Sequence, residues 1–312
     1  DQVGNNANDG NDDNDWALSV TGAGTLEVAD LNQNPDADLS GLLAGVVNAA
    51  YATSGTFTGD LGTGVTVVVG DGVTMTAEAT VVDGQTIENA VDGDGRTLSG
   101  NLVVEDNAAG DAIDADLSIV ETNIAFGAGV ELGAVTFPTL TTVDNDPDPD
   151  FVQTVALTAA QASGQTINGG ASGQVIISDL GADPVDLTGI NVDDATATVP
   201  ATATLDATTD LGDVNVVVAT GVLTLTGAQA SGLSITGGGD VVITDVTPAD
   251  DLSGIDAGGL TIQAADGELE LAVTAAQADA AGVEGFGGAT LDKVTVTELE
   301  DALGTDLSGI NA

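Results

Sequence analysis

A pair of acidic residues that recurs five times constrains this chain more than any other feature. Each time, a run of Val, Ile, Leu and Thr ends in an acid, and six to ten residues later a second acid opens an acid-Leu-Ser/Thr turn. The five pairs are Asp30/Asp38, Asp106/Asp116, Asp179/Asp186, Asp245/Asp251 and Glu298/Asp306. The chain is therefore a degenerate repeat array, and such arrays build extended surfaces more readily than they build one active site.

The apolar runs between these acids predict an all-β fold. They are short, rich in β-branched residues and bounded by Gly, Asp, Asn and Ser, which is typical of strands and turns. Examples are the runs 65–69, 102–104, 175–177, 214–218, 222–226, 241–244 and 293–297. Short segments at 160–164, 228–232 and 276–279 follow strands and are each expected to form one helical turn.

Two all-β architectures fit the repeats. Internally similar strands favour a β-solenoid-like stack of strand-turn units, most clearly in the C-terminal half. The second acids lie 78, 70, 65 and 55 residues apart, and this irregular spacing favours tandem β-sandwich domains. We expect four segments: an acidic, flexible N-terminal tether (1–15), an N-terminal β domain (16–143), an acidic Pro-containing linker (144–150) and a C-terminal β-repeat domain (151–312).

The charge of the chain limits its partners. Fifty acidic residues face only Arg96 and Lys293, which gives a formal net charge of −48. Nucleic acid and anionic membrane surfaces would be repelled, and the longest apolar stretch, 42–52, is too short to span a bilayer. Salt adaptation and calcium binding are both sources of such acidity. Asp outnumbers Glu more than threefold and lies mainly in turns, which favours calcium, and the two origins can coexist.

The residue types that most catalysis needs are scarce here. The chain has no Cys and no His, so thiolate and imidazole chemistry, zinc and haem lose their usual ligands. Paired carboxylates are plentiful, but aromatic residues make up only 2% of the chain, whereas glycosidase sites usually have aromatic platforms. We expect no enzyme activity, no nucleic-acid partner and no membrane insertion.

Calcium is the expected cofactor. Oxygen ligands one residue apart can converge on one cation when a loop curls, and acids at strand ends form a second set of candidates. The candidate ligands are Asp9, Asn11, Asp13, Asp15, Asp92, Asp94, Asp144, Asp146, Asp148, Asp150, Asp179, Asp186, Asp245, Asp251 and Asp306. The competing interpretation is that the loops are merely solvated, and that each strand-end Asp caps its own turn by accepting backbone N–H bonds.

Two repeated elements carry a resemblance. They are the Gln-Ala-Ser-Gly segments at 161–164 and 229–232 and the Asp-Leu-Ser-Gly-Ile segments at 251–255 and 306–310. With its acidic, cysteine-free composition, the chain resembles repetitive bacterial surface proteins: calcium-dependent S-layer proteins, large adhesins and extracellular filament subunits. This resemblance implies a secreted or cell-surface protein that folds on calcium and assembles with itself, with a possible cell-surface anchor. The alternative is a calcium-rigidified stalk segment of a large adhesin.

The two ends of the sequence suggest how copies could join. The start at Asp1 is expected of a processed product, and the fifth repeat stops two residues after Ile310. An unfinished β unit leaves an open strand edge, and the strand expected at 16–20 could complete that edge in the next copy by β-augmentation. The expected product is a head-to-tail filament, with a two-dimensional lattice as the other possibility.

Overall fold

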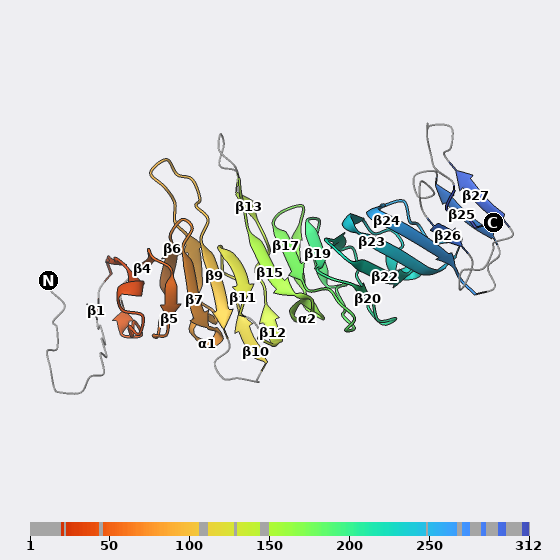
Figure 1. Ribbon diagram of the computed structural model, residues 1–312. Helices are drawn as coiled ribbons and strands as arrows, with labels where there is room; N and C mark the ends of the chain where they lie inside the picture. The colour runs from red at the N-terminus through yellow and green to blue at the C-terminus, as the bar shows by residue number, and fades with distance from the viewer. Residues whose placement is uncertain are drawn as a thin grey trace. The chain divides into compact units, whose positions relative to one another are not determined.

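The computed structural model describes residues 20–21, 23–43, 46–105, 112–127, 130–143, 150–247, 249–266, 270–274, 282–284, 293–297 and 308–311. The protein is mostly β, with 50% strand and 6% helix, and its stacked parallel sheets form a β-solenoid of about 11 turns (Figure 1). The all-β prediction is confirmed. Of the two predicted architectures the solenoid forms, and not the tandem sandwiches.

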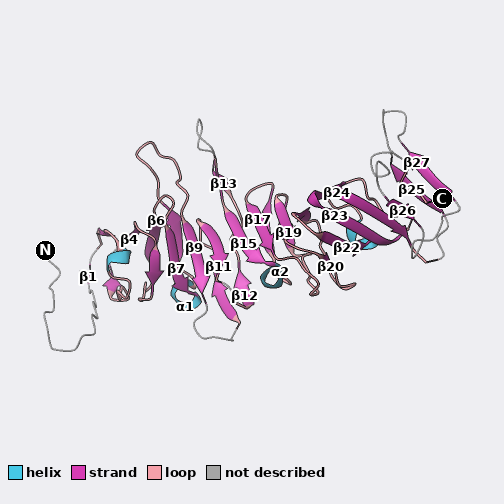
Figure 2. Cartoon of the chain, in the orientation of Figure 1, coloured by secondary structure: helices cyan, strands magenta, loops and turns pink. Residues whose placement is uncertain are grey.

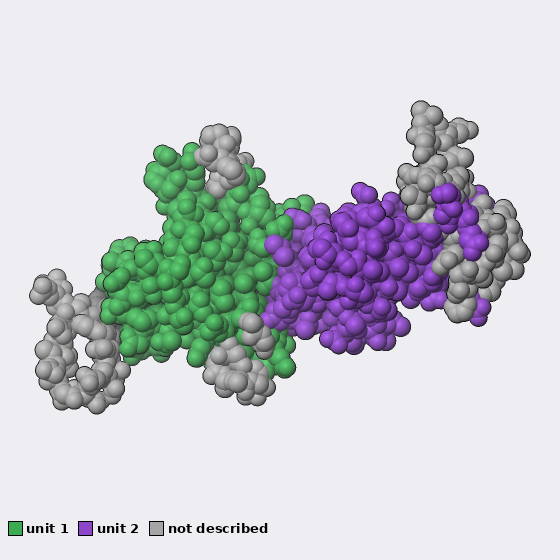
Figure 3. All heavy atoms as spheres, in the orientation of Figure 1, with its two compact units in different colours: residues 1–156, 167–174 green, residues 157–166, 175–312 purple. Residues whose placement is uncertain are grey.

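The chain divides into two compact units, which are described separately. Unit 1 comprises residues 1–156 and 167–174, and unit 2 comprises residues 157–166 and 175–312 (Figure 3). The division falls within β15 (Thr154–Thr158). Of the predicted linker 144–150, only Asp150 lies among the described residues, and the predicted tether 1–15 lies wholly outside them. The predicted domain division therefore stays a prediction.

Unit 1 stacks its coils through two ladders of parallel strands, in the orders β2-β4-β6-β8 and β5-β7-β9-β11-β15. Parallel pairs β1-β3 and β10-β12 and the antiparallel pair β13-β14 complete it. Its other elements are β1 (Val20–Thr21), β2 (Thr25–Val28), η1 (Leu31–Gln33), β3 (Leu42–Leu43), β4 (Val46–Tyr51), β5 (Gly55–Phe57), β6 (Val65–Val69), β7 (Thr74–Glu78), α1 (Ala79–Val82), β8 (Thr86–Asn89), β9 (Asn101–Glu105), β10 (Ile113–Asp116), β11 (Asn123–Phe126), β12 (Leu132–Thr136), β13 (Thr142–Val143), β14 (Phe151–Val152) and β16 (Ile167–Gly170).

Alternation of side chains explains why these segments form strands. In β6, Val65, Val67 and Val69 are fully buried, whereas the residues between them are half-buried. Val67 pairs with Ala49 of β4 on one side and with Ile87 of β8 on the other. Successive residues of a strand point to opposite faces, so each coil contributes one apolar row to the interior, and the rows of neighbouring coils stack.

Unit 2 is built from the ladder β17-β19-β21-β23, to which β20-β22 and β24-β26 are joined at β23, and from the pair β25-β27. Its elements are α2 (Ala159–Ala162), β17 (Gln174–Ser178), β18 (Ile190–Val192), β19 (Ala195–Val199), β20 (Ala203–Thr204), β21 (Asn215–Val218), β22 (Val222–Thr226), α3 (Gly227–Ala230), β23 (Ile235–Val246), β24 (Ile255–Ala264), β25 (Glu270–Thr274), β26 (Gly282–Glu284) and β27 (Lys293–Thr297).

The long strand β23 takes part in two ladders. Ile235 and Thr236 pair with β21, and residues 240–244 pair with β22. The glycines between them allow this change of partner. Gly237 has φ = 121°, and a Cβ there would lie 2.3 Å from the carbonyl oxygen of Val218. The Gly-Gly-Gly run at 237–239 is therefore a bend at close backbone approach.

The first and third sequence repeats each contain three coils. Asp38 and Asp60 pair as an isolated parallel bridge, as do Asp186 and Asp210, so a second Asp-Leu corner lies one coil after the first. The third corner of each set is a helical turn, α1 or α3, and Figure 2 shows α1 at the margin of the strands. The predicted helical turns at 160–164 and 228–232 are confirmed as α2 and α3, and the one at 276–279 lies outside the described residues.

Candidate functional site

The repeated acids form the corners of the coils. At each corner the carboxylate Oδ1 accepts the backbone N–H of the residue two positions later, at distances of 2.7–3.1 Å. The corner acids are Asp38, Asp60, Asp116, Asp186, Asp210 and Asp251. The leucine that follows each acid is buried. These acids thus cap their own turns, which is the competing interpretation given above for strand-end acids.

A hydroxyl strengthens four of these corners. In Asp186-Leu187-Thr188, the Thr188 hydroxyl donates to Asp186 Oδ1 at 2.6 Å and its backbone N–H donates at 3.1 Å. The hydroxyl, and then the backbone N–H, lower the pKa of Asp186 below its ordinary value. The pKa values of Asp38, Asp116 and Asp251 are lowered in the same way by their own serines.

The sequence reasoning missed two corner acids, Asp60 and Asp210. In both, glycine replaces the Ser/Thr after Asp-Leu, so the predicted acid-Leu-Ser/Thr pattern does not match. The turn nevertheless forms, because the capping bond needs only a backbone N–H, which Gly62 and Gly212 donate to the acids at 2.7 and 3.1 Å. The shorter pattern Asp-Leu-Gly, at 60–62 and 210–212, could have identified both acids.

The first acids of the third and fourth pairs have an uncommon backbone conformation. Asp179 and Asp245 have φ values of 59° and 53°, in the left-handed region. Short polar side chains such as Asp tolerate this region better than other non-glycine residues. Both acids turn the chain at the end of a buried apolar run.

Two excursions leave the coil path in unit 1, and in Figure 1 the first of them and strand β13 of the second lie on the same side of the stacked strands. The first, residues 90–99, is closed by the antiparallel bridge between Val91 and Thr97. The second is described at residues 141–143 and 150–152, where the β13-β14 ladder closes it. A depression of about 620 Å³ lies between them, lined among others by Asp71, Arg96 and Asp150.

Buried amide side chains hold the bases of these excursions. Asn89 is 6% exposed; its Oδ1 accepts the N–H of Gly100 at 2.8 Å and its Nδ2 donates to the carbonyl of Glu121 at 3.2 Å. Gln153, 1% exposed, donates from Nε2 to the carbonyls of Val120 and Thr122. Each amide replaces backbone pairing that the excursion interrupts, so the walls of the depression stand on a fixed base.

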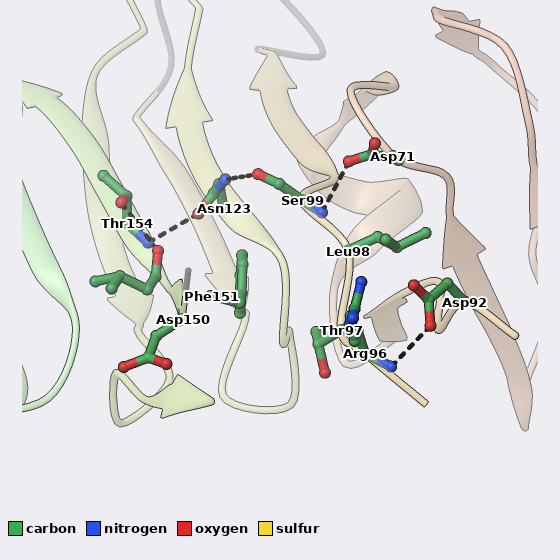
Figure 4. Close-up of a pocket in the computed structure, with 11 residues that line it drawn as sticks. Asp71, Asp92, Arg96, Thr97, Leu98, Ser99, Asn123, Asp150, Phe151 and Thr154 are labelled. Carbon is green, nitrogen blue, oxygen red and sulfur yellow. Dashed lines mark hydrogen bonds between the residues drawn. The ribbon is translucent and has the colours of Figure 1, made fainter. Parts of the chain in front are cut away.

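A line of hydrogen bonds crosses the floor of the depression (Figure 4). Asn123 Oδ1 accepts the backbone N–H of Thr154 at 2.9 Å, and Asn123 Nδ2 donates to the Ser99 hydroxyl at 3.3 Å. The backbone N–H of Ser99 donates to Asp71 Oδ1 at 3.3 Å. A smaller, more apolar depression shares Asn123 and Thr154 and continues over Ala125 and Ala156.

Arg96 was not among the predicted site residues, although it is one of only two basic residues in the chain. Its backbone N–H donates to Asp92 Oδ1 at 3.0 Å. This bond is the largest cause that lowers the pKa of Asp92, and the guanidinium charge adds to it. The rarity of basic residues was the signal that could have identified Arg96.

The predicted calcium ligands fall into four sets. Asp92 and Asp150 line the depression. Asp94 donates its backbone N–H to Asp92, which lies in the same loop as Arg96, the only basic residue of unit 1. Asp186 and Asp251 cap turns. Asp179 directly follows β17, and Asp245 is the penultimate residue of β23. No group of three acids able to hold a metal occurs within the described ranges. Outside those ranges lie Asp9, Asn11, Asp13, Asp15, Asp144, Asp146, Asp148 and Asp306.

Comparison with known proteins gives no relative. No protein-family model, no curated protein and no solved structure matches this chain. The part of the chain that the structure describes also contains no helix that is long and apolar enough to cross a membrane.

Proposed function

We propose that the protein is a structural, self-assembling extracellular protein, a filament or surface-layer subunit that calcium stabilises. The observation that carries the proposal is the recurrence of the Asp-Leu corner along a parallel solenoid. Each coil buries an apolar row against the next, and at the six Asp-Leu corners the acid caps its own turn. In such a fold every coil depends on its neighbours, so the fold favours continuation by further copies.

The N-terminal coil supports the idea of contact through strand edges. Among the described strands, β2 pairs only with β4, so no described strand covers the other edge of residues 25–28. Glu27 on this edge accepts a hydrogen bond from Asn48 and carries a charge, a common protection against uncontrolled pairing. Neutralising that charge by a cation would open the edge to a second copy.

The predicted donor strand, residues 16–20, can be placed only at its last residue. Val20 pairs in parallel with Leu42, and Thr21 pairs with Leu43, within the same chain. A head-to-tail contact through this strand therefore requires residues 16–19 or an exchange of the β1-β3 pair between copies. The contact remains part of the proposal, with Asp9, Asp13 and Asp15 as the acids that calcium would order.

Calcium enters the proposal because of charge. A net charge of −48 with two basic residues leaves nearly all carboxylates without a basic partner, and monovalent salt screens only beyond about 8 Å. Divalent cations shared between copies would reduce this repulsion where two acidic surfaces meet. The alternative function, a calcium-rigidified stalk of a larger adhesin, is favoured by the depression in unit 1, since a stalk can carry binding sites along its length.

Electron microscopy tests the proposal. The purified chain at physiological salt should form filaments or ordered layers in millimolar calcium, and these should disperse in chelator and form again when calcium is restored. Magnesium at the same concentration is the matched control for simple charge screening. Monodisperse single copies under all of these conditions would contradict self-assembly and leave the adhesin stalk as the better explanation.

A further inference from the structure

The smaller depression of unit 1 is an uncharged hollow on the β9-β11-β15 ladder. It has a volume of about 230 Å³ and is lined among others by Asn123, Ala125, Thr154 and Ala156. Ala125 pairs with Val103 of β9 on one side and with Ala156 of β15 on the other, so two short side chains lie next to each other in one row. None of the lining residues carries a charge, although the chain has 50 acids.

The polar groups around this hollow already have partners within the chain. Asn123 Oδ1 accepts the backbone N–H of Thr154 at 2.9 Å, and Asn123 Nδ2 donates to Asn101 Oδ1 at 3.3 Å. The Thr154 hydroxyl donates to the carbonyl of Val152 at 3.3 Å. An apolar group can therefore cover the hollow and leave these donors bonded. The strand ladders fix the shape of the hollow in advance, which lowers the ordering cost of a contact.

Unit 2 carries an apolar side chain that suits the hollow. Ile176 of β17 is 41% exposed, and it is the only exposed large apolar side chain among the described residues of unit 2. It pairs with Thr196 of β19, which pairs in turn with Asn215 of β21. The row that contains Ile176 is therefore uncharged, and Ile176 can approach an uncharged surface without bringing a carboxylate of its own row into the contact.

Charge indicates that the occupant of the hollow is a second copy of this chain. With a net charge of −48 and only two basic residues, a contact that buries carboxylates leaves them unpaired, which is costly. A cationic partner would be drawn to the acidic corners and not to the hollow. Two copies meet at least cost where both surfaces are uncharged.

We propose that Ile176 of one copy enters the smaller depression of another copy. This inference rests on the self-assembly proposed above and names the two surfaces that carry it. Burial of the exposed part of Ile176 against Ala125 and Ala156 supplies the driving force. Because the isoleucine and the hollow are different surfaces, every copy brings one of each to the assembly.

Two variants remove the two sides of this contact. Ile176→Asp replaces the apolar group by a carboxylate, and Ala125→Phe fills the hollow. Each should weaken association in calcium at least about tenfold, as measured by sedimentation velocity. Ile119→Asp is the matched control, because Ile119 is 46% exposed but lies between Asp116 and Glu121, and it should leave association unchanged. The melting temperature shows whether each variant is folded, and Ala156→Phe is a second way to fill the hollow.

Mixing the two variants tests the contact directly. The Ala125→Phe copy keeps Ile176 and the Ile176→Asp copy keeps the hollow, so the two should bind each other although neither associates with itself. In the NMR spectrum of a ¹³C-methyl-labelled Ala125→Phe copy, unlabelled Ile176→Asp copies should shift the Ile176 methyl signals saturably and leave those of Ile119 unchanged.

The outcomes separate this contact from the proposed function. A wild-type chain that stays a single copy under all conditions would overturn both. Wild-type assembly together with undiminished association of either variant, or with no shift of Ile176 on mixing, would overturn this contact alone.

Discussion

The sequence spacing between paired strands is less regular in unit 1 than in unit 2. Along β5-β7-β9-β11-β15 of unit 1, paired residues lie 20, 27, 22 and 31 positions apart. Along β17-β19-β21-β23 of unit 2, the corresponding steps are 20, 19 and 19. Unit 2 keeps nearly constant steps, and it too has an amide that donates to backbone carbonyls: Gln229 Nε2 donates to the carbonyls of Asp206 and Thr209 at 2.7 and 3.1 Å. Unit 1 accommodates two excursions, and each one is matched by a buried amide side chain at its base. Side chains can therefore replace the backbone pairing that an excursion interrupts.

The largest expected difference concerns the buried amides. Gln153→Ala removes two buried hydrogen bonds and leaves two carbonyls without that donor, so it should destabilise the protein by about 3 kcal/mol. Thr158→Ala in unit 2 removes the N-cap of α2, whose hydroxyl accepts the backbone N–H of Gln161, and should cost about 1 kcal/mol. Urea denaturation of the two variants measures the difference. An equal or larger cost for Thr158→Ala would contradict the role assigned to the amides of unit 1.

The glycines that follow the helical turns should behave alike in both units. Gly84, Gly164 and Gly232 have φ values of 66°, 74° and 79°, and each donates its N–H at 2.8 Å to the carbonyl of the next corner acid. An added Cβ would meet no atom within 4 Å, so the cost of Ala is that of the left-handed backbone alone, about 1–2 kcal/mol. Asn should cost less. Thermal unfolding of the three Ala variants should give similar losses, and a loss at only one position would show that the three corners are not equivalent.

The N-terminal cap of α1 can be improved by substitution. Thr158 and Thr226 cap α2 and α3 by accepting the N–H of Gln161 and Gln229, whereas α1 of unit 1 begins after Glu78, which makes no side-chain cap bond. Glu78→Thr should therefore stabilise the protein by roughly 0.5–1 kcal/mol. Glu78→Gln removes the same charge without adding a short cap and is the control. If Gln stabilises as much as Thr, relief of charge repulsion and not capping is the cause.

The smallest expected effect is a change of pKa at the corners. The pKa values of Asp186 and Asp251 are lowered in the folded protein, first of all by the hydroxyls of Thr188 and Ser253. The stabilisation linked to these two acids is thus present above the unfolded value of 3.8 and is lost as the pH falls through the lower folded pKa. Thr188→Val and Ser253→Ala should raise the pKa of the adjacent Asp, as measured by NMR titration of its carboxyl carbon. An unchanged pKa would show that the backbone N–H alone sets it.

The strands were the most predictable part of the fold. The runs 65–69, 222–226 and 293–297 correspond residue for residue to β6, β22 and β27, because alternating β-branched residues between turn residues have few other stable arrangements. The length of one coil was not predictable from the acidic pairs. In the first and third repeats, three different solutions, Asp-Leu-Ser/Thr, Asp-Leu-Gly and a helical turn, occupy the same corner in successive coils, so a search for one of them finds only one coil in three there.

The depression could not be predicted, because its groups come from different coils. Asp71 and Thr154 are far apart in sequence and are connected only through Ser99 and Asn123 of the intervening coils. The corner acids show another limit. A carboxylate that caps its own turn and one that binds a cation occur in the same Asp- and Gly-rich patterns, and only the positions of the surrounding N–H groups distinguish them.

The most direct test of the structural, calcium-stabilised role is the melting temperature at constant ionic strength, first with calcium and then with chelator. An ion that binds only the folded chain at about 100 times its dissociation constant adds roughly 2.7 kcal/mol per site. Chelation should therefore lower the melting temperature by about 5 °C or more, and calcium should restore it. An unchanged melting temperature in chelator, together with unfolding when NaCl is withdrawn, would contradict the calcium account and identify the acidity as an adaptation to salt.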